Sequence, residues 1–357
     1  MVRLVVIMKF FNWVWKGSIG TFRIFYFLLA LVIILVAAYV LGGYYFLVKG
    51  ALGSDMGMAL SMTAWVDKYF PHVPFWYPLA GGGVSITHSY PVFSFYLVAL
   101  LKRLTSLDLI QAFRVLGFSS VPLMALGIYA FVALRFENQT AALIASILYL
   151  LSPIAWVWLF DWGFYADSVS HMFVMPAIIF WDLFFTSFLD STEKTKNRIF
   201  LALTIVFVSL ALLTHFVTGL GLITFFGFYV IGYTVKAKER KKIFIRGILA
   251  WSLVSLLTLG ITAFTTFPFY RYTKVAAEGG LGGGGAYEAY KQSKMVLDHI
   301  LGFRPLTEEF IAARHITFPA AVSLLALLGV FLSFQSARLF TFSLFAIYAS
   351  TLALSPD

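Results

Sequence analysis

The chain has 357 residues, of which 61% are hydrophobic and only 12% are charged. Soluble domains carry roughly a quarter charged residues, so this composition excludes a soluble globular fold. The net charge of +10 does not indicate nucleic-acid binding, because the basic residues lie mostly at the ends of apolar segments, where they orient a membrane protein and meet anionic lipid.

Apolar segments long enough to cross about 30 Å of hydrocarbon recur along the chain. They predict an all-α polytopic membrane protein with about nine transmembrane helices. The stretch 199–235 is too long for one span and is interrupted near Thr214, His215 and Gly219, which predicts a tight hairpin between two helices. The predicted spans are 24–48, 110–134, 140–160, 172–189, two within 199–235, 248–269, 317–334 and 339–354.

The short apolar segment 92–101 determines the predicted topology. It follows Tyr90-Pro91 and runs directly into Lys102 and Arg103, which suits a helix lying in the membrane interface better than one that spans it. With interfacial helices in this first outer loop, the short loops on the cytoplasmic side carry Lys and Arg and the short outer loops carry none, as the positive-inside rule requires.

This topology predicts a multi-pass plasma-membrane protein with a cytoplasmic N-terminus and an extracytoplasmic active site. The expected parts are a cytoplasmic segment at 1–23, a seven-helix membrane module at 24–269 that includes an outer loop at 49–109, a large outer loop at 270–316, and two further helices at 317–357. A fragment of a longer protein is an alternative. The polar residues that come out on the outer side are His72, His88, His171, His215, His299, His315, Asp55, Asp67, Asp161, Asp167 and Asp298.

Asp55 and Asp167 are the candidate catalytic acids, since a chain without cysteine must rely on other side chains for chemistry. Asp55 follows the first predicted span and would act as general base or cation ligand; an N-cap for the next helix is the alternative. Asp167 precedes the fourth span and would complete a carboxylate pair that holds a divalent cation or divides base and electrostatic roles. A plain N-cap is again the alternative, and Asp161 competes for the same role.

Imidazole and basic side chains on the same face are candidates for binding a phosphate. His215 interrupts a strongly apolar stretch, and an ionisable group at membrane depth marks a functional site by default; a hairpin residue bonded to a carbonyl is the alternative. Arg271 and Lys274 follow the seventh span, where they would clamp a lipid phosphate or serve as ordinary interface anchors. Further candidate contacts to a donor or an acceptor are His88, Tyr90, Asp161 and His171.

Four local features follow one another along the chain: Asp55 after the first span, His88-Ser-Tyr90-Pro91 before the interfacial helix, Phe113-Arg114 opening the second span, and Ser152-Pro153 shortly before Asp167. Together they resemble the GT-C superfamily of membrane glycosyltransferases, which includes protein O-mannosyltransferases, aminoarabinose transferases and oligosaccharyltransferases. The resemblance implies a seven-helix module followed by a large outer loop. It also implies an inverting transfer of sugar from a polyprenyl-phosphate donor, in the bilayer, to an outer lipid, glycan or protein acceptor.

Two other functions compete with a transferase. A secondary transporter would relay protons through buried acids and histidines, but that class is expected to show internal repeats and charges near the bilayer centre, whereas this sequence shows no repeat and its candidate charges gather at one edge. A noncatalytic assembly subunit would use the large outer loop to dock a partner. The sequence does not specify the sugar, the acceptor or the oligomeric state.

Overall fold

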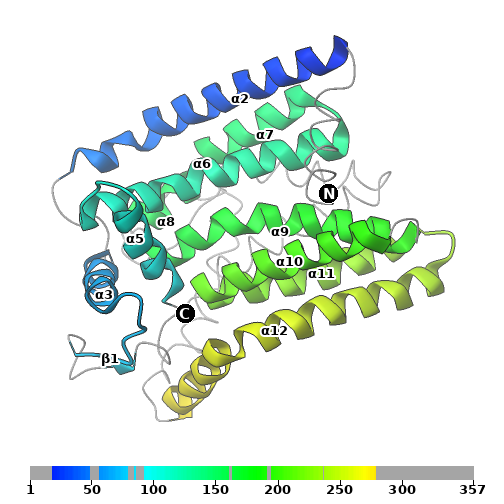
Figure 1. Cartoon of the computed structure of the whole chain (residues 1–357). Helices are drawn as coiled ribbons and strands as arrows, with labels where there is room; N and C mark the ends of the chain where they lie inside the picture. The colour runs from blue at the N-terminus through cyan, green and yellow to red at the C-terminus, as the bar shows by residue number, and fades with distance from the viewer. Residues whose placement is uncertain are drawn as a thin grey trace, which may run out of the picture.

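The computed structural model describes residues 18–48, 56–78, 84–85, 92–160, 163–190, 194–235 and 237–278. Within these ranges long helices run side by side and form a bundle (Figure 1). The helices are α2 (Ser18–Gly42), α3 (Met56–Tyr69), α5 (Phe93–Leu104), α6 (Leu109–Phe136), α7 (Gln139–Leu151), α8 (Pro153–Phe160), α9 (Tyr165–Asp190), α10 (Lys194–Thr214), α11 (Phe216–Val235) and α12 (Arg240–Glu278), with the 3-10 turn η1 (Gly43–Phe46) and the short strands β1 (Trp76–Tyr77) and β2 (Val84–Ser85).

Among the described residues, six helices are long and apolar enough to cross a membrane: Ile24–Phe46, Leu109–Phe136, Tyr165–Leu189, Lys196–Thr214, Phe216–Val235 and Arg240–Phe269. Each corresponds to one predicted span, so the all-α polytopic class is confirmed. The predicted spans 317–334 and 339–354 lie outside the described residues, as does the loop beyond 278. The total of nine spans stays a prediction.

The structure divides the remaining predicted span, 140–160, into two helices. Helix α7 ends at Leu151, Ser152 is extended (φ −70°, ψ 123°), and α8 begins at Pro153. A proline disfavours the helical conformation of the residue before it, which accounts for the break. The Trp156 indole donates to the carbonyl of Leu150 at 2.7 Å and so satisfies one acceptor that the break exposes. The predicted span 140–160 thus consists of two helices and not of one continuous helix.

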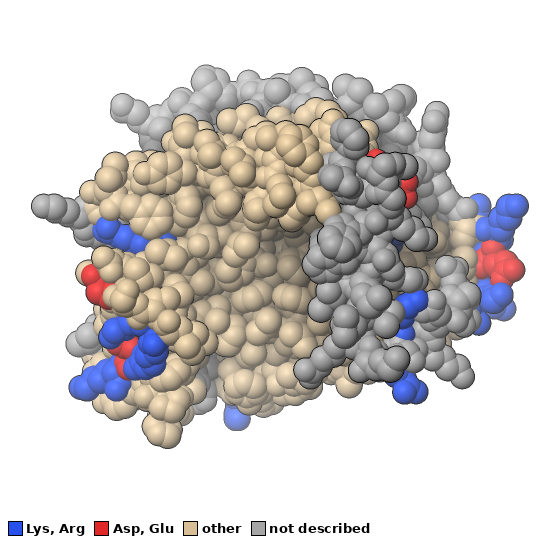
Figure 2. Space-filling model, turned by 45° about the horizontal axis from the view of Figure 1, so that its top comes forward, with Lys and Arg blue, Asp and Glu red and all other residues tan. Residues whose placement is uncertain are grey.

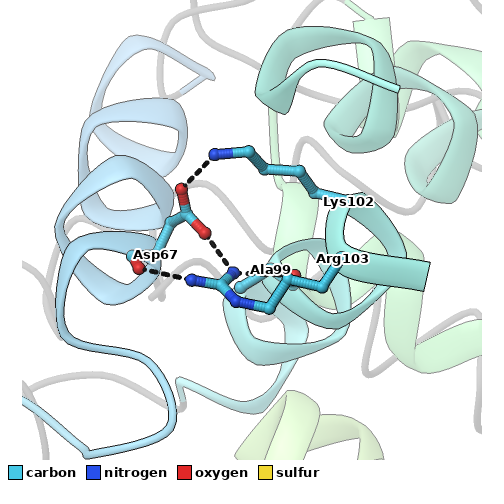
Figure 3. A network of polar contacts seen from close by, with 4 residues as sticks. All are labelled: Asp67, Ala99, Lys102 and Arg103. Atoms are coloured by element: carbon cyan, nitrogen blue, oxygen red, sulfur yellow. Dashed lines mark hydrogen bonds and ion pairs between the residues drawn. The ribbon is translucent and has the colours of Figure 1, made fainter. Parts of the chain in front are cut away.

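Helices α3 and α5 and the β1–β2 hairpin form a small unit fastened by polar contacts, and in Figure 1 α3 and α5 run at steep angles to the long helices. Lys102 Nζ contacts Asp67 Oδ2 at 2.6 Å, and Arg103 pairs with the same carboxylate and donates to the Asp67 carbonyl at 2.9 Å (Figure 3). Burial alone would raise the pKa of the Asp67 carboxyl, but hydrogen bonds from Lys102 and Arg103 outweigh burial and hold that pKa below its usual range.

Helix α5 has 12 residues, which corresponds to a rise of about 18 Å. That length is short of the roughly 30 Å of hydrocarbon that a span must cross, in keeping with the interfacial placement predicted from the sequence. Its hydrophobic residues Phe95, Val98 and Ala99 are buried, and its last turn carries the two basic residues that hold Asp67.

The bundle has two hydrophobic clusters that share α9. The first joins α2, α3, α5, α6, α7 and α8 to the start of α9, and it includes Val169. The second joins α10, α11 and α12 to the rest of α9, and its centre is Trp181, which stacks on Phe226 at 4.5 Å between ring centroids. Helix α9 is therefore the element on which side chains from both halves of the bundle converge.

Candidate functional site

Asp167 lies in the first turn of α9, where its side chain is 11% exposed. The helix begins at Tyr165, so Asp167 is not the N-cap residue that the alternative interpretation expected. Tyr165 fixes this end of α9 against α6: its ring stacks on Phe113 at 3.7 Å, and its hydroxyl donates to the Phe113 carbonyl at 2.9 Å. The Phe113-Arg114 segment thus supports the backbone that carries Asp167.

The Asp167 carboxylate faces the start of α11 and collects polar groups from it. Thr218 Oγ1 donates to Asp167 Oδ1 at 2.6 Å, and His215 Nδ1 lies 2.8 Å from the same oxygen. The two partners are also 2.9 Å apart from Nδ1 to Oγ1. The other carboxylate oxygen, Oδ2, lies 3.6 Å from His171 Nε2, one turn further along α9. Two histidines and one aspartate predicted for the site are therefore brought together.

The hairpin predicted near His215 is confirmed. His215 is the one residue between α10, which ends at Thr214, and α11, which begins at Phe216. Gly219 permits the close return of the chain, because a Cβ there would lie 2.3 Å from Leu212 Cγ and 2.6 Å from Leu212 Cα. Any larger residue would push α11 away from α10 and move His215 relative to Asp167.

The end of α7 borders the same cluster. Tyr149 lies near Asp167, and its carbonyl accepts a hydrogen bond from Ser152 N at the α7–α8 break. Among the described residues, the buried hydroxyls of Ser152 and Ser168 have no hydrogen-bond partner within the protein. The Ser152-Pro153 break, singled out in the sequence as a family-like feature, thus lies on the side of the bundle that holds the candidate site.

Arg271 and Lys274 lie on helix α12, which continues beyond the predicted seventh span to Glu278. The Arg271 side chain is exposed. Two residues earlier, the Phe269 ring packs against Phe216 at 5.1 Å between centroids, and Phe216 adjoins His215. Arg271 therefore lies at the same end of the bundle as the Asp167 cluster. The predicted site residues Asp55, His88, Tyr90 and Asp161 lie outside the described residues.

Neither a family model nor a curated protein sequence matches the chain. Its fold matches solved structures of the archaeal oligosaccharyltransferase AglB from Archaeoglobus fulgidus. The form in complex with an inhibitory peptide and a dolichol-phosphate has a TM-score of 0.62 at 13% identity, over 94% of this chain and 48% of that one. The chain has an oligosaccharyltransferase-like fold.

Two further Archaeoglobus fulgidus oligosaccharyltransferase structures give the same result. The apo form matches with a TM-score of 0.61 at 14% identity, over 96% of this chain and 48% of that one. The form tethered through a disulfide to an acceptor peptide containing the NVT sequon matches with a TM-score of 0.60 at 14% identity, over 93% and 47%. The resemblance to oligosaccharyltransferases that the local motifs suggested is confirmed at the level of the fold, and the chain spans about half the length of these proteins.

The described part of this oligosaccharyltransferase-like fold contains no group of three or more His, Asp or Glu residues arranged to hold a metal ion. Asp167 Oδ1 already accepts a hydrogen bond from Thr218 Oγ1 and faces His215 Nδ1. A cation held between Asp55 and Asp167 would have to use the remaining oxygen of Asp167, and this cation site stays a prediction.

Sequence reasoning missed Thr218 and the partners of Asp182. Thr218 follows His215 by three residues, a spacing that places both on one face of the helix start, and this was the available signal. Asp182 lies within an apolar span and pairs with Arg135 of α6, while the Tyr229 hydroxyl of α11 donates to its carboxylate. Such a charge inside a span is itself a signal, and it shows that the charges do not all gather at one edge as predicted.

Proposed function

We propose that this chain is a membrane glycosyltransferase that moves a sugar from a polyprenyl-phosphate donor to an extracytoplasmic lipid, glycan or protein acceptor. The oligosaccharyltransferase-like fold supports a membrane glycosyltransferase. A dolichol-phosphate accompanies one of the neighbours, which supports a lipid-linked donor. The observation that carries the proposal is the contact of 2.8 Å between Asp167 and His215 at one end of an apolar bundle, where both groups were expected on chemical grounds.

The charge distribution supports an extracytoplasmic site. The turn between α11 and α12 lies at the opposite end of the bundle, where Lys238 of the turn and Arg240, Lys241 and Lys242 at the start of α12 are exposed. Basic residues of this kind mark the cytoplasmic side of short loops. On the face drawn in Figure 2, the charged side chains of the described residues gather toward the two ends, with an uncharged belt between them. The plasma membrane is the proposed location.

The proposed reaction divides its work between two acids and a phosphate-binding group. Asp55 takes the acceptor proton, and Asp167 assists as the second acid, with a divalent cation between them as a candidate. His215, Arg271 and Lys274 bind the donor phosphate, since cationic donors aimed at developing negative charge stabilise the departure of a phosphate. His88, Tyr90, Asp161 and His171 are the proposed contacts to the sugar or the acceptor.

Polyprenyl phosphate itself is the probe that tests this proposal without knowledge of the sugar. The purified chain in nanodiscs is titrated with polyprenyl phosphate and, as the matched control, with the uncharged polyprenol, and binding is measured by native mass spectrometry. We expect the phosphate to bind at least about tenfold more tightly, since a charge-assisted hydrogen bond contributes about 1.5–3 kcal/mol. His215→Ala and Arg271→Ala should each remove most of that difference.

A control variant distinguishes a site from general attraction to charge. Glu239→Gln removes an exposed carboxylate that pairs with Lys242 at the other end of the bundle, so it should leave the preference unchanged. Equal binding of phosphate and polyprenol by the wild-type chain would refute a lipid-phosphate donor, and a noncatalytic assembly subunit would then be the better description. Turnover is followed with polyprenyl-phosphate sugars, where Asp167→Asn should abolish release of polyprenyl phosphate.

A further inference from the structure

We propose that residues 70–76, which follow α3 and enter β1, are a membrane anchor whose exposed aromatic side chains lie in the phospholipid headgroup layer. This segment is called the anchor loop, and the small unit of α3, α5 and the β1–β2 hairpin is called the α3–α5 unit. The partner of the anchor loop is the bilayer surface itself. This role goes beyond the proposed transfer of sugar and does not depend on it.

Short connections place the α3–α5 unit close to the membrane surface. One span ends at Phe46 and the next begins at Leu109, so the unit lies between two points at which the chain meets the end of a span. Residues 105–108 alone separate α5 from α6, and a link this short keeps the end of α5 within about 18 Å of the start of the α6 span. Figure 1 shows α3, α5 and β1 at the end of the bundle where α2 ends and α6 begins.

Two hydrogen bonds hold the anchor loop against α3 and α5. The Trp65 indole of α3 donates to the carbonyl of Trp76 at 2.8 Å, and the Tyr96 hydroxyl of α5 donates to the carbonyl of His72 at 2.6 Å. The ion pairs of Asp67 with the last turn of α5 join the two helices (Figure 3), and α5 packs against α6. The anchor loop is therefore fixed relative to the start of the α6 span.

The anchor loop exposes large apolar side chains. The exposed fraction is 50% for Val73, 62% for Phe75 and 49% for Trp76. Successive side chains of a strand point to opposite sides: Tyr77 is buried and its hydroxyl contacts Ser61, so the neighbouring Trp76 faces outward. Apolar side chains grouped in this way at a surface indicate an interaction partner.

The charges beside the anchor loop favour an anionic partner. Among the described residues of the α3–α5 unit, the charged side chains are Lys68, Lys102, Arg103 and a single acid, Asp67. Asp67 is 13% exposed and pairs with Lys102 and Arg103, which are both more than a third exposed; Lys68 is exposed as well. The unit thus presents an excess of positive charge, which complements the phosphates of an anionic bilayer surface.

Rings and cations alternate on this surface, as they do where proteins meet the lipid–water interface. The Arg103 guanidinium lies 4.2 Å from the centre of the Phe70 ring, and Lys68 Nζ lies 5.1 Å from that of Trp65. Aromatic side chains are enriched at headgroup level, and long basic side chains extend from apolar surroundings toward phosphate. A bilayer surface accommodates both kinds of side chain at once, which is why the anchor loop is assigned to phospholipid.

The chain has no cysteine, so a single introduced thiol can be labelled at a chosen position of the anchor loop. A nitroxide on Phe75→Cys is studied by electron paramagnetic resonance in nanodiscs of phosphatidylcholine and phosphatidylglycerol. Dissolved oxygen relaxes a label in lipid, and a nickel chelate relaxes a label in water. Leu249→Cys, 60% exposed on the apolar surface of α12, is the lipid reference, and Glu239→Cys, exposed at the other end of the bundle, is the water reference.

We expect the ratio of oxygen access to nickel access at residue 75 to be shifted from the water reference toward the lipid reference. A ratio equal to that at residue 239 overturns the proposal and leaves the surface to a water-soluble partner. Low access of both reagents means that protein covers the loop, and this result overturns the proposal as well. Neither measurement requires transfer of sugar, so the result is independent of the proposed function.

Lys68→Gln tests the part played by charge. In the Phe75→Cys background it should lower the ratio in nanodiscs that contain phosphatidylglycerol and leave the ratio unchanged in phosphatidylcholine alone. Lys242→Gln is the matched control, because this side chain is 58% exposed at the other end of the bundle, and it should change neither value. The same ratio in both lipid compositions, with and without Lys68, would refute the charge complementarity that assigns the loop to anionic phospholipid.

Discussion

Helix α9 carries two buried aspartates whose surroundings differ in kind. Asp167 lies in the first turn among His215, Thr218 and His171. Asp182 lies about 22 Å further along the helix, where it is 2% exposed and pairs with Arg135. Both carboxylates also accept a hydrogen bond from a hydroxyl group of α11. The donor is Thr218 for Asp167 and Tyr229 for Asp182.

The partners of the two aspartates determine what each cluster can do. Arginine keeps its charge at any physiological pH and holds a planar geometry, so the Asp182 cluster is a fixed link between α6, α9 and α11. Histidine gains and loses a proton near neutral pH, so the Asp167 cluster can take part in chemistry. The same helix thus has a structural end and a reactive end, and the predictions below test that division.

Asp182→Ala should have the largest effect on stability. It removes the carboxylate that neutralises the buried Arg135 guanidinium, and loss of one partner of a buried ion pair costs about 3–5 kcal/mol. We expect a clear fall in the thermal midpoint of unfolding in detergent. The double variant Arg135→Met/Asp182→Leu should recover much of the loss, because an apolar pair of similar volume is often as stable. A midpoint equal to that of the wild type in Asp182→Ala would contradict a structural role.

Asp167→Asn should have the converse effect, with transferase activity lost and the fold retained. Asparagine has the same shape and can still accept a hydrogen bond from Thr218, but it removes the carboxylate charge beside His215. We expect kcat for donor turnover to fall about a hundredfold or more, with a thermal midpoint close to that of the wild type. A destabilisation as large as that of Asp182→Ala would mean that both ends of α9 are structural.

Gly219→Ala should disturb the reactive end through packing. The added methyl would meet Leu212 at 2.3 Å, and overpacking of this kind costs about 1–3 kcal/mol. We expect lower thermal stability together with reduced donor turnover. Gly260→Ala is the matched control, because nothing lies within 4 Å of a Cβ at Gly260, and alanine there should be neutral or stabilising. Equal behaviour of the two variants would argue against a tight α10–α11 hairpin.

The smallest effect is expected at the third charged cluster, Asp67 with Lys102 and Arg103. Because the folded pKa of Asp67 is lowered, its contribution to stability is present above the unfolded pKa of about 4 and is lost as pH falls through the folded value. Both cations are more than a third exposed, so Asp67→Asn should cost less than about 1 kcal/mol. In this variant, hydrogen exchange at neutral pH should become faster in residues 93–104. The exchange rates of the other helices should stay unchanged.

The sequence was a good guide to the elements and a partial guide to the site. Apolar length and flanking charge are local properties, so six spans and the hairpin at His215 were predictable. The break at Ser152 was missed because the segments on both sides of Ser152-Pro153 are strongly apolar and carry no charge, so that together they are long enough for one span. The pairing of Asp167 with His215 depends on the packing of α9 against α11, which periodicity does not encode, and Thr218 is one of many threonines in apolar helices.

The length of α12 has a mechanical consequence. Its 39 residues correspond to a rise of about 58 Å, roughly twice the thickness of the hydrocarbon layer, and its last turns lie beyond the apolar stretch that ends at Phe269; this end of α12 is called the stalk. The Phe269–Phe216 contact joins the base of this stalk to the residue next to His215. A tilt of this end of α12 would therefore be felt next to His215 through the contact between Phe269 and Phe216.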